Sequence, residues 1–175
     1  ESAGIPLIMA GPGIPQNKVV STPVSLVDLF PTVIENAGLE TLESDTDLPG
    51  TSLISIARSD DQKDRVVFSE YHGAASVSGV FMLRKGSFKY IHYVSFSPEL
   101  FDLEKDPEEL TNLSEMPEYS EIIDQFRAIL KDIVDPEKID ALAKKDQAAL
   151  IQKFGGAKKI IESGGLSGTP VPDQI

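Results

Sequence analysis

The stretch RVVFSEYHGAASVSGVFMLRKGSFKYIHYVSFSPELFDL, residues 65–103, decides the fold of this chain. It contains runs rich in β-branched and aromatic residues, separated by short segments with Gly, Ser or Pro. Lys85-Gly86 is typical of a hairpin turn, because glycine readily adopts the positive φ that tight turns need. Connections this short favour antiparallel neighbours, so the sequence predicts an antiparallel meander. The predicted strands are 65–71, 80–84, 88–94 and 99–103.

Helices are predicted after this sheet. Between Tyr119 and Val134, apolar residues recur every three or four positions, which is typical of a helix with one apolar face. We expect this helix to cover one face of the sheet. Asp135 and Pro136 suit the N-cap and first position of a further helix, which should end at Gly155-Gly156.

The N-terminal residues have the pattern of a larger α/β layer. The apolar run 5–10 precedes a Gly-Pro-Gly turn and predicts a strand buried on both faces of a mainly parallel sheet. Ser25 and Asp28 have capping-box spacing, and Gly38 is a typical residue just after a helix, so a helix is predicted between them. Pro31 should kink this helix or mark its true start.

The predicted fold class is therefore α/β overall, and α+β for this chain. One strand and one helix of a main layer come first, then a four-stranded antiparallel sheet covered by a helix, then a helical C-terminal extension. The predicted units are 1–64, which ends in a connecting loop over 39–64; 65–134, the sheet and its helix; and 135–175, which adds helical turns over 157–163 and a Gly/Pro tail over 164–175.

Composition restricts the possible partners. The chain has 175 residues and a net charge of −12, which disfavours nucleic acid and anionic membrane surfaces. Its longest apolar runs are far shorter than a membrane span, so we expect a soluble chain. It contains no cysteine, which excludes disulfides and thiolate chemistry within it. The sequence begins without Met and has no signal-peptide pattern, so we expect a piece of a longer protein, from either the cytoplasm or the periplasm.

No catalytic motif can be written from these residues. There is no Gly-x-Ser-x-Gly elbow, phosphate-binding Gly-rich loop or His-Glu-x-x-His sequence. The Asp residues between 45 and 64 lack a recognisable ligand spacing, so a hydrated acidic surface is favoured over a metal site. We predict no catalytic residue and no metal ligand in this chain.

Glu70 and His72 are the candidate substrate-pocket residues. A predicted strand ends in Ser-Glu-Tyr-His-Gly and delivers both side chains to a loop of small residues, and strand ends often line pockets. The alternative is a structural role for both. His92 lies in the middle of a predicted strand and is interpreted as structural.

Three blocks resemble the C-terminal part of the sulfatase family, in the alkaline-phosphatase-like superfamily. The first block joins IPLIMAGPG at 5–13 with SLVDLFPT at 25–32 and Ala37-Gly38. The second is LPGTSL at 48–53, and the third is RKGSFKYI at 84–91 with ELFDLEKDPEE at 99–109 and Asn112-Leu113. Their order and spacing together carry the resemblance, which covers about residues 4–115.

The resemblance implies hydrolysis of a sulfate ester by a formylglycine nucleophile beside Ca²⁺ or Mg²⁺. Formylglycine is made within a Cys/Ser-x-Pro-x-Arg motif, which this chain lacks, because Ser25 stands where Ser21-Thr22-Pro23 would require Arg. We therefore expect the N-terminal catalytic part of the same protein to hold these groups and the sulfate-ester substrate. The isolated chain is expected to be inactive.

Residues 135–175 resemble the extension of bacterial members near the choline-sulfatase branch. The resemblance to choline sulfatases implies an acidic residue soon after a Glu-Tyr pair, which would hold the quaternary ammonium. Here His72-Gly73 follows the Glu-Tyr pair, which argues against choline-O-sulfate as the substrate. Two alternatives stay open. The chain could be an interaction module that forms a homo-oligomer through 135–175, or the C-terminal part of a phosphodiesterase or phosphonate monoester hydrolase of the same superfamily.

Overall fold

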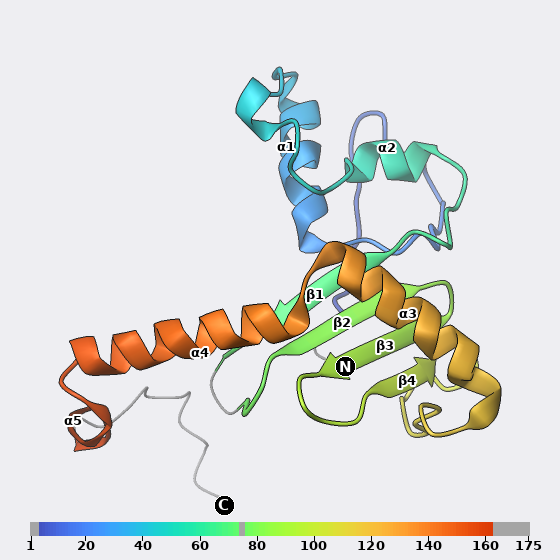
Figure 1. The fold of residues 1–175 in the computed structure, drawn as a ribbon. Helices are drawn as coiled ribbons and strands as arrows, with labels where there is room; N and C mark the ends of the chain where they lie inside the picture. The colour runs from blue at the N-terminus through green and yellow to red at the C-terminus, as the bar shows by residue number, and fades with distance from the viewer. Residues whose placement is uncertain (1–3, 74–75, 163–175) are drawn as a thin grey trace, which may run out of the picture.

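The antiparallel meander is the centre of the structure. The computed structural model describes residues 4–73 and 76–162, and its sheet has the order β1-β2-β3-β4 with every neighbouring pair antiparallel (Figure 1). Gly86 has a φ of 58° in the β2–β3 turn, as its hairpin role requires. The prediction is confirmed within one or two residues at the strand ends. The strands are β1 Val67–Tyr71, β2 Val80–Lys85, β3 Phe88–Tyr93 and β4 Glu99–Asp102.

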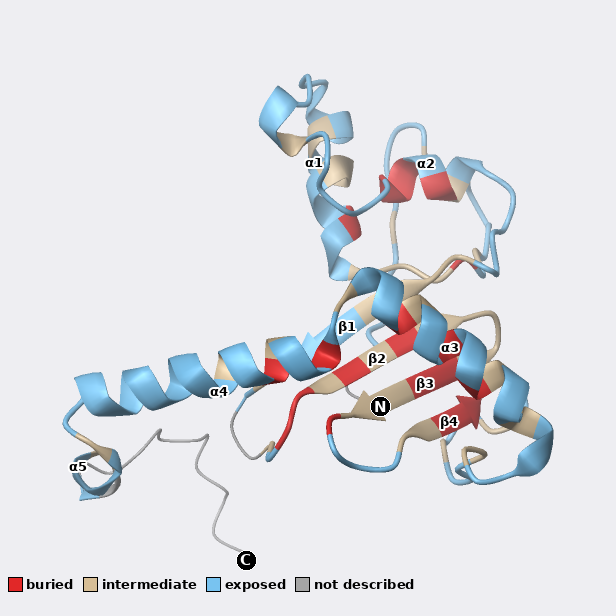
Figure 2. Ribbon diagram, in the orientation of Figure 1, coloured by how far each residue is buried: buried red, intermediate tan, exposed pale blue. Residues whose placement is uncertain are grey.

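Helix α3, Ser120–Ile133, covers one face of this sheet, as predicted. Leu83, Tyr90 and Leu100 are paired across β2, β3 and β4 and have no exposed surface. The ring of Phe126 on α3 stacks on Tyr90 at 5.5 Å between centroids. The buried stripes of α3 and the sheet face each other and form the core (Figure 2).

The next two helices form the C-terminal extension. Asp135 caps α4, Pro136–Lys153, by accepting a hydrogen bond from the Lys138 amide at 3.1 Å, and Pro136 occupies the first position. Helix α5, Ala157–Glu162, follows the predicted glycine stop, and α4 projects from the sheet as an arm (Figure 1). Within the described residues no helix is long and apolar enough to cross a membrane. The predicted tail over 164–175 lies outside the described residues.

The predicted N-terminal helix is confirmed as a single 3₁₀ turn, Leu26–Asp28, that leads into α1, Leu29–Ala37. The capping box between Ser25 and Asp28 is present, and Gly38 ends α1 with a φ of 64°. Pro31 is the third residue of α1, so it lies at the start of the helix, where a missing N–H costs little.

Two N-terminal predictions are wrong. Residues 5–10 form no strand, because a strand requires a hydrogen-bonded neighbour and none of the described residues supplies one there. The stretch 39–64 is not merely a loop, since it contains a 3₁₀ turn, Glu43–Asp45, and helix α2, Leu53–Arg58. The Ser52 hydroxyl caps α2, in which Leu53, Ile54 and Ile56 are buried, and α2 packs against α1. The helix is so short that its apolar residues do not show a full helical period.

Asp28 connects the N-terminal helices to the sheet. Its carboxylate is completely buried and receives two hydrogen bonds from Arg65, at 2.6 and 3.0 Å, just before β1 begins. The amides of Ser25 and Thr51 each donate to it at 2.8 Å. Burial by itself would raise the pKa of Asp28, but the hydrogen bonds from Arg65, Thr51 and Ser25 and the charge of Arg65 bring it below its ordinary value.

We expect Asp28→Asn to destabilise the chain at neutral pH by about 3–5 kcal/mol, because it leaves Arg65 half-buried without its charge partner. The pKa of Asp28 is lowered by folding, so its contribution is fully present above the unfolded-state pKa and is lost as pH falls through the folded-state pKa. Urea unfolding at neutral and acidic pH measures this. The gap between wild type and variant should narrow below about pH 4. Exposed Asp47→Asn is the control, and an equal effect of both changes would contradict the prediction.

Phe126→Ala should lower the free energy of unfolding by about 3–5 kcal/mol, since it removes a ring that is 3% exposed and stacked on Tyr90. Lys131→Ala on the exposed side of the same helix should change it by less than about 0.5 kcal/mol. Urea denaturation of both variants measures the difference. Equal midpoints would show that α3 does not complete the core.

Candidate functional site

Glu70 and His72 lie together at the end of β1. Glu70 pairs with Phe81 of β2 and therefore points to the same face of the sheet as the core. The Nε2 atom of His72 is 3.7 Å from a Glu70 carboxylate oxygen, and the imidazole meets the Phe81 ring edge-on at 5.3 Å. The Glu70 side chain is 42% exposed, whereas that of His72 is 19% exposed. The predicted pair is thus brought into contact at the rim of the core.

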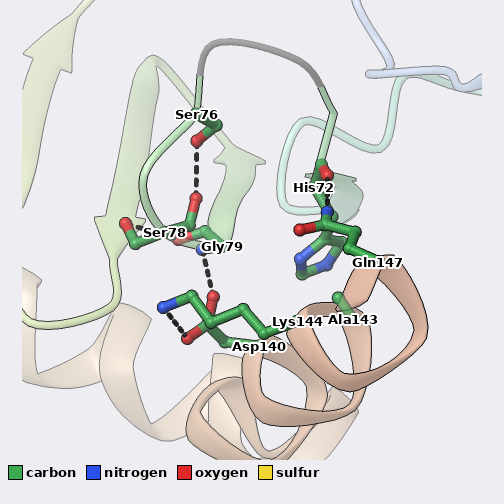
Figure 3. Close-up of a pocket in the computed structure, with 8 residues that line it drawn as sticks. All are labelled: His72, Ser76, Ser78, Gly79, Asp140, Ala143, Lys144 and Gln147. Atoms are coloured by element: carbon green, nitrogen blue, oxygen red, sulfur yellow. Dashed lines mark hydrogen bonds and ion pairs between the residues drawn. The ribbon is translucent and has the colours of Figure 1, made fainter. Parts of the chain in front are cut away.

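A small hollow opens beside His72 (Figure 3). One side comes from the connection between β1 and β2 and the other from a single face of α4, whose contributing residues are spaced i, i+3, i+4 and i+7. Its volume of ≈ 10 Å³ suits about one water molecule, so no organic substrate fits inside it. The lining residues are His72, Ser76, Ser78, Gly79, Asp140, Ala143, Lys144 and Gln147.

Asp140 is the best-connected group in this hollow. Its Oδ1 atom accepts a 2.6 Å hydrogen bond from the Gly79 amide, and its Oδ2 atom pairs with the Lys144 ammonium at 2.8 Å. The hydrogen bond from Lys144 lowers the pKa of Asp140 against the effect of burial, and the Gly79 amide and the charges of Lys144 and His72 lower it further. Asp140 is therefore a fixed carboxylate that holds structure and does not act as a base.

The imidazole of His72 keeps its hydrogen-bonding capacity. Both ring nitrogens are buried, and neither has a hydrogen-bond partner among the described residues. The main chain of His72 is held separately, because Gln147 donates to its carbonyl at 2.6 Å. The buried ring nitrogens can thus bond to a water molecule in the hollow beside them.

His92 occupies a different position from His72. It is the next-to-last residue of β3, and its ring centroid lies 6.3 Å from that of Phe81 in β2. Burial lowers the pKa of His92, Glu137 opposes this shift, and Arg127 adds to it. A lowered pKa keeps the ring uncharged near neutral pH, which agrees with the predicted structural role.

The described residues provide no metal centre. Among residues 4–73 and 76–162, no group of three or more His, Asp or Glu side chains is placed to hold a metal ion. The groups that sequence reasoning missed are Asp140, Lys144 and Gln147. Their signal is the polar i, i+4, i+7 spacing on α4, which shows a polar face without showing what it contacts.

This arrangement defines a class: a domain built from an antiparallel sheet, a covering helix and a helical arm, in which the described residues form no metal centre. Residues 1–137 match the family described as N-sulphoglucosamine sulphohydrolase, C-terminal. The chain belongs to this family of C-terminal sulfatase domains, as the sequence blocks predicted.

Curated relatives support this membership. The chain is 38% identical over 149 residues to arylsulfatase K of Mus musculus and 37% identical over 152 residues to that of Homo sapiens; each alignment covers 80% of this chain. Arylsulfatase K of Xenopus laevis is 35% identical over 172 residues, or 89% of this chain. The chain spans 26%, 27% and 31% of these three relatives, respectively.

Solved structures agree on the fold. A structure described as a 2-O GAG sulfatase is 33% identical, with a TM-score of 0.61, over 80% of this chain and 30% of that chain. A protein solved in complex with its substrate D-glucosamine-2-N,6-O-disulfate is 23% identical, with a TM-score of 0.52, over 61% of this chain and 23% of that chain, and it shows the fold alone. These relatives give no support to an interaction module or a phosphoesterase. The choline-sulfatase branch and the bacterial origin stay predictions.

Proposed function

We propose that the protein containing this chain hydrolyses sulfate esters, and that the chain supplies one wall of the substrate site through Glu70 and His72. The observation that carries this proposal is the buried imidazole of His72, whose nitrogens are unbonded within the described residues and lie beside a half-exposed carboxylate. An imidazole can donate to sulfate or hydroxyl oxygen, directly or through one bound water molecule, and a carboxylate can accept from sugar hydroxyl groups.

A sulfated sugar is the substrate class that this pair suits best. The relative described as a 2-O GAG sulfatase is 33% identical over four-fifths of the chain, and the relatives named arylsulfatase K are slightly more similar. Choline-O-sulfate would require anionic groups around its cation, whereas His72-Gly73 follows Tyr71 here. A sulfated glycosaminoglycan unit is therefore the proposed substrate.

The reaction centre would lie in the N-terminal catalytic part. Formylglycine would supply the nucleophile there, and Ca²⁺ or Mg²⁺ would supply positive charge for the sulfate. The described residues do not fit the metal, since they form no cluster of suitable ligands. Within this chain, the proposed role of Glu70 and His72 is limited to binding and orienting the sugar.

Full-length His72→Ala and Glu70→Ala variants should raise KM for a 2-O-sulfated disaccharide about tenfold each, because each loses one hydrogen bond to a bound group. KM for 4-nitrophenyl sulfate, which lacks the sugar hydroxyl groups, should change little. Ser69→Ala is the control, since Ser69 is exposed on the opposite face of β1. Unchanged disaccharide kinetics in both variants would remove Glu70 and His72 from the site.

We also propose a docking surface for the catalytic part on this chain. Leu26, Leu29, Phe30 and Val33 are spaced along one side of the first helical segment and are 67%, 45%, 43% and 61% exposed. Four large apolar side chains in one exposed row mark a surface that another part of the protein covers. Since the chain spans 26–31% of the relatives above, we propose that their remaining length corresponds to the covering part.

Val33→Asp should prevent this chain from co-purifying with a separately expressed catalytic part, because docking would bury an unpaired charge. Asn36→Asp adds the same charge to an exposed polar position of α1 and should leave recovery unchanged. Affinity capture followed by size-exclusion chromatography measures recovery. Equal recovery of both variants would place the interface elsewhere.

A further inference from the structure

Two hydrogen bonds from α4 hold both ends of the β1–β2 connection. Asp140 accepts from the Gly79 amide just before β2, and Gln147 donates to the His72 carbonyl just after β1; both distances are 2.6 Å. These contacts join residues that are 61 and 75 positions apart in the chain. Figure 3 shows the two bonds arising from the same side of the helix. The two ends of the connection, at His72 and Gly79, are therefore held by a helix that is distant in the sequence.

Burial makes the Asp140 contact costly to lose. Its side chain is 9% exposed, so the Gly79 amide that it satisfies is also removed from water. An unsatisfied buried amide costs more than a hydrogen bond contributes on average. Lys144 completes the arrangement by pairing with the second oxygen of Asp140, and this pair orients the carboxylate toward Gly79.

His72 is the side chain that benefits from this arrangement. Its carbonyl is held by Gln147, its ring packs against Phe81, and its Nε2 atom faces Glu70. Its ring has no hydrogen bond of its own among the described residues, so only packing, Glu70 and the fixed backbone orient it. A shift of the backbone by one ångström would move the ring by a comparable distance, which is enough to weaken binding severely.

We infer that Asp140 and Gln147 are positioning residues, which hold the His72 end of the β1–β2 connection in the geometry that binds substrate. This inference rests on the proposed function of His72. It assigns a role in substrate affinity to α4, which is remote from β1 in the sequence and carries no group of its own for the reaction.

Full-length Asp140→Ala and Gln147→Ala variants test the inference. Each should raise KM for the 2-O-sulfated disaccharide about tenfold, while kcat and KM for 4-nitrophenyl sulfate stay within about twofold of wild type. Asp140→Asn retains an oxygen that can accept from Gly79 and should recover most of the affinity. Asp146→Asn and Gln152→Ala are matched controls, because both residues are exposed on α4 outside the hollow.

Hydrogen exchange provides a readout that does not depend on activity. The Gly79 amide should exchange at least tenfold faster in Asp140→Ala than in wild type or Asp146→Asn, because its acceptor is removed. Unchanged exchange, or unchanged disaccharide KM in both alanine variants while His72→Ala raises it, would overturn the positioning role and leave the proposed function intact. Unchanged KM in His72→Ala itself would overturn the proposed function, and the inference with it.

Discussion

The buried pair of Asp28 and Arg65 is the constraint on which the chain's organisation depends. A carboxylate with no exposed surface is tolerated only when its oxygens are satisfied, and here Arg65 and the amides of Ser25 and Thr51 together provide four hydrogen bonds. These donors come from the start of the first helical segment, from the residues before α2 and from the residues before β1. One side chain therefore fixes how three segments meet.

The same hydrogen-bond network connects two of the sequence blocks that carry the family resemblance. Gly50 has a φ of 125°, and a Cβ atom there would lie 2.5 Å from the Val27 carbonyl, so this turn packs directly on the backbone next to Asp28. Thr32 accepts from the Leu53 amide at 2.8 Å and so ties α1 to the start of α2. The blocks 25–32 and 48–53 that carry the family resemblance are therefore partners in space. Hydrogen bonds between the two blocks hold α1 and the start of α2 together.

The sheet and its helices were predictable because their information is local. Three signals each span only a few residues: the alternation of apolar and polar residues in the strands, the Lys85-Gly86 turn, and the three-and-four spacing of apolar residues in α3. Asp135-Pro136 marks the start of α4 by capping chemistry alone. The prediction of a strand at 5–10 is wrong because an apolar segment without a period becomes a strand only beside another strand. The sequence pattern does not show whether such a neighbour is present. Helix α2 was missed because Leu53 to Arg58 is too short to display a helical period.

In the candidate site, too, some residues could be predicted from their local sequence and others depend on contacts that are distant in the sequence. Glu70 and His72 could be predicted from the strand end that carries them. Asp140 and Gln147 bind residues 61 and 75 positions away, so the sequence around Gly79 and His72 gives no sign of these contacts. Asp140 also shows why a carboxylate near a histidine is weak evidence for catalysis. Its oxygens are committed to Gly79 and Lys144, and its pKa is lowered chiefly by Lys144, so it holds no proton to give and has little basicity to offer near neutral pH. Neither ring nitrogen of His72 has a hydrogen-bond partner among the described residues, and such a ring can bind a group in a defined place only if the backbone that carries it is fixed. On the proposed function, Asp140 and Gln147 would affect substrate affinity through the position of His72, without touching the substrate themselves.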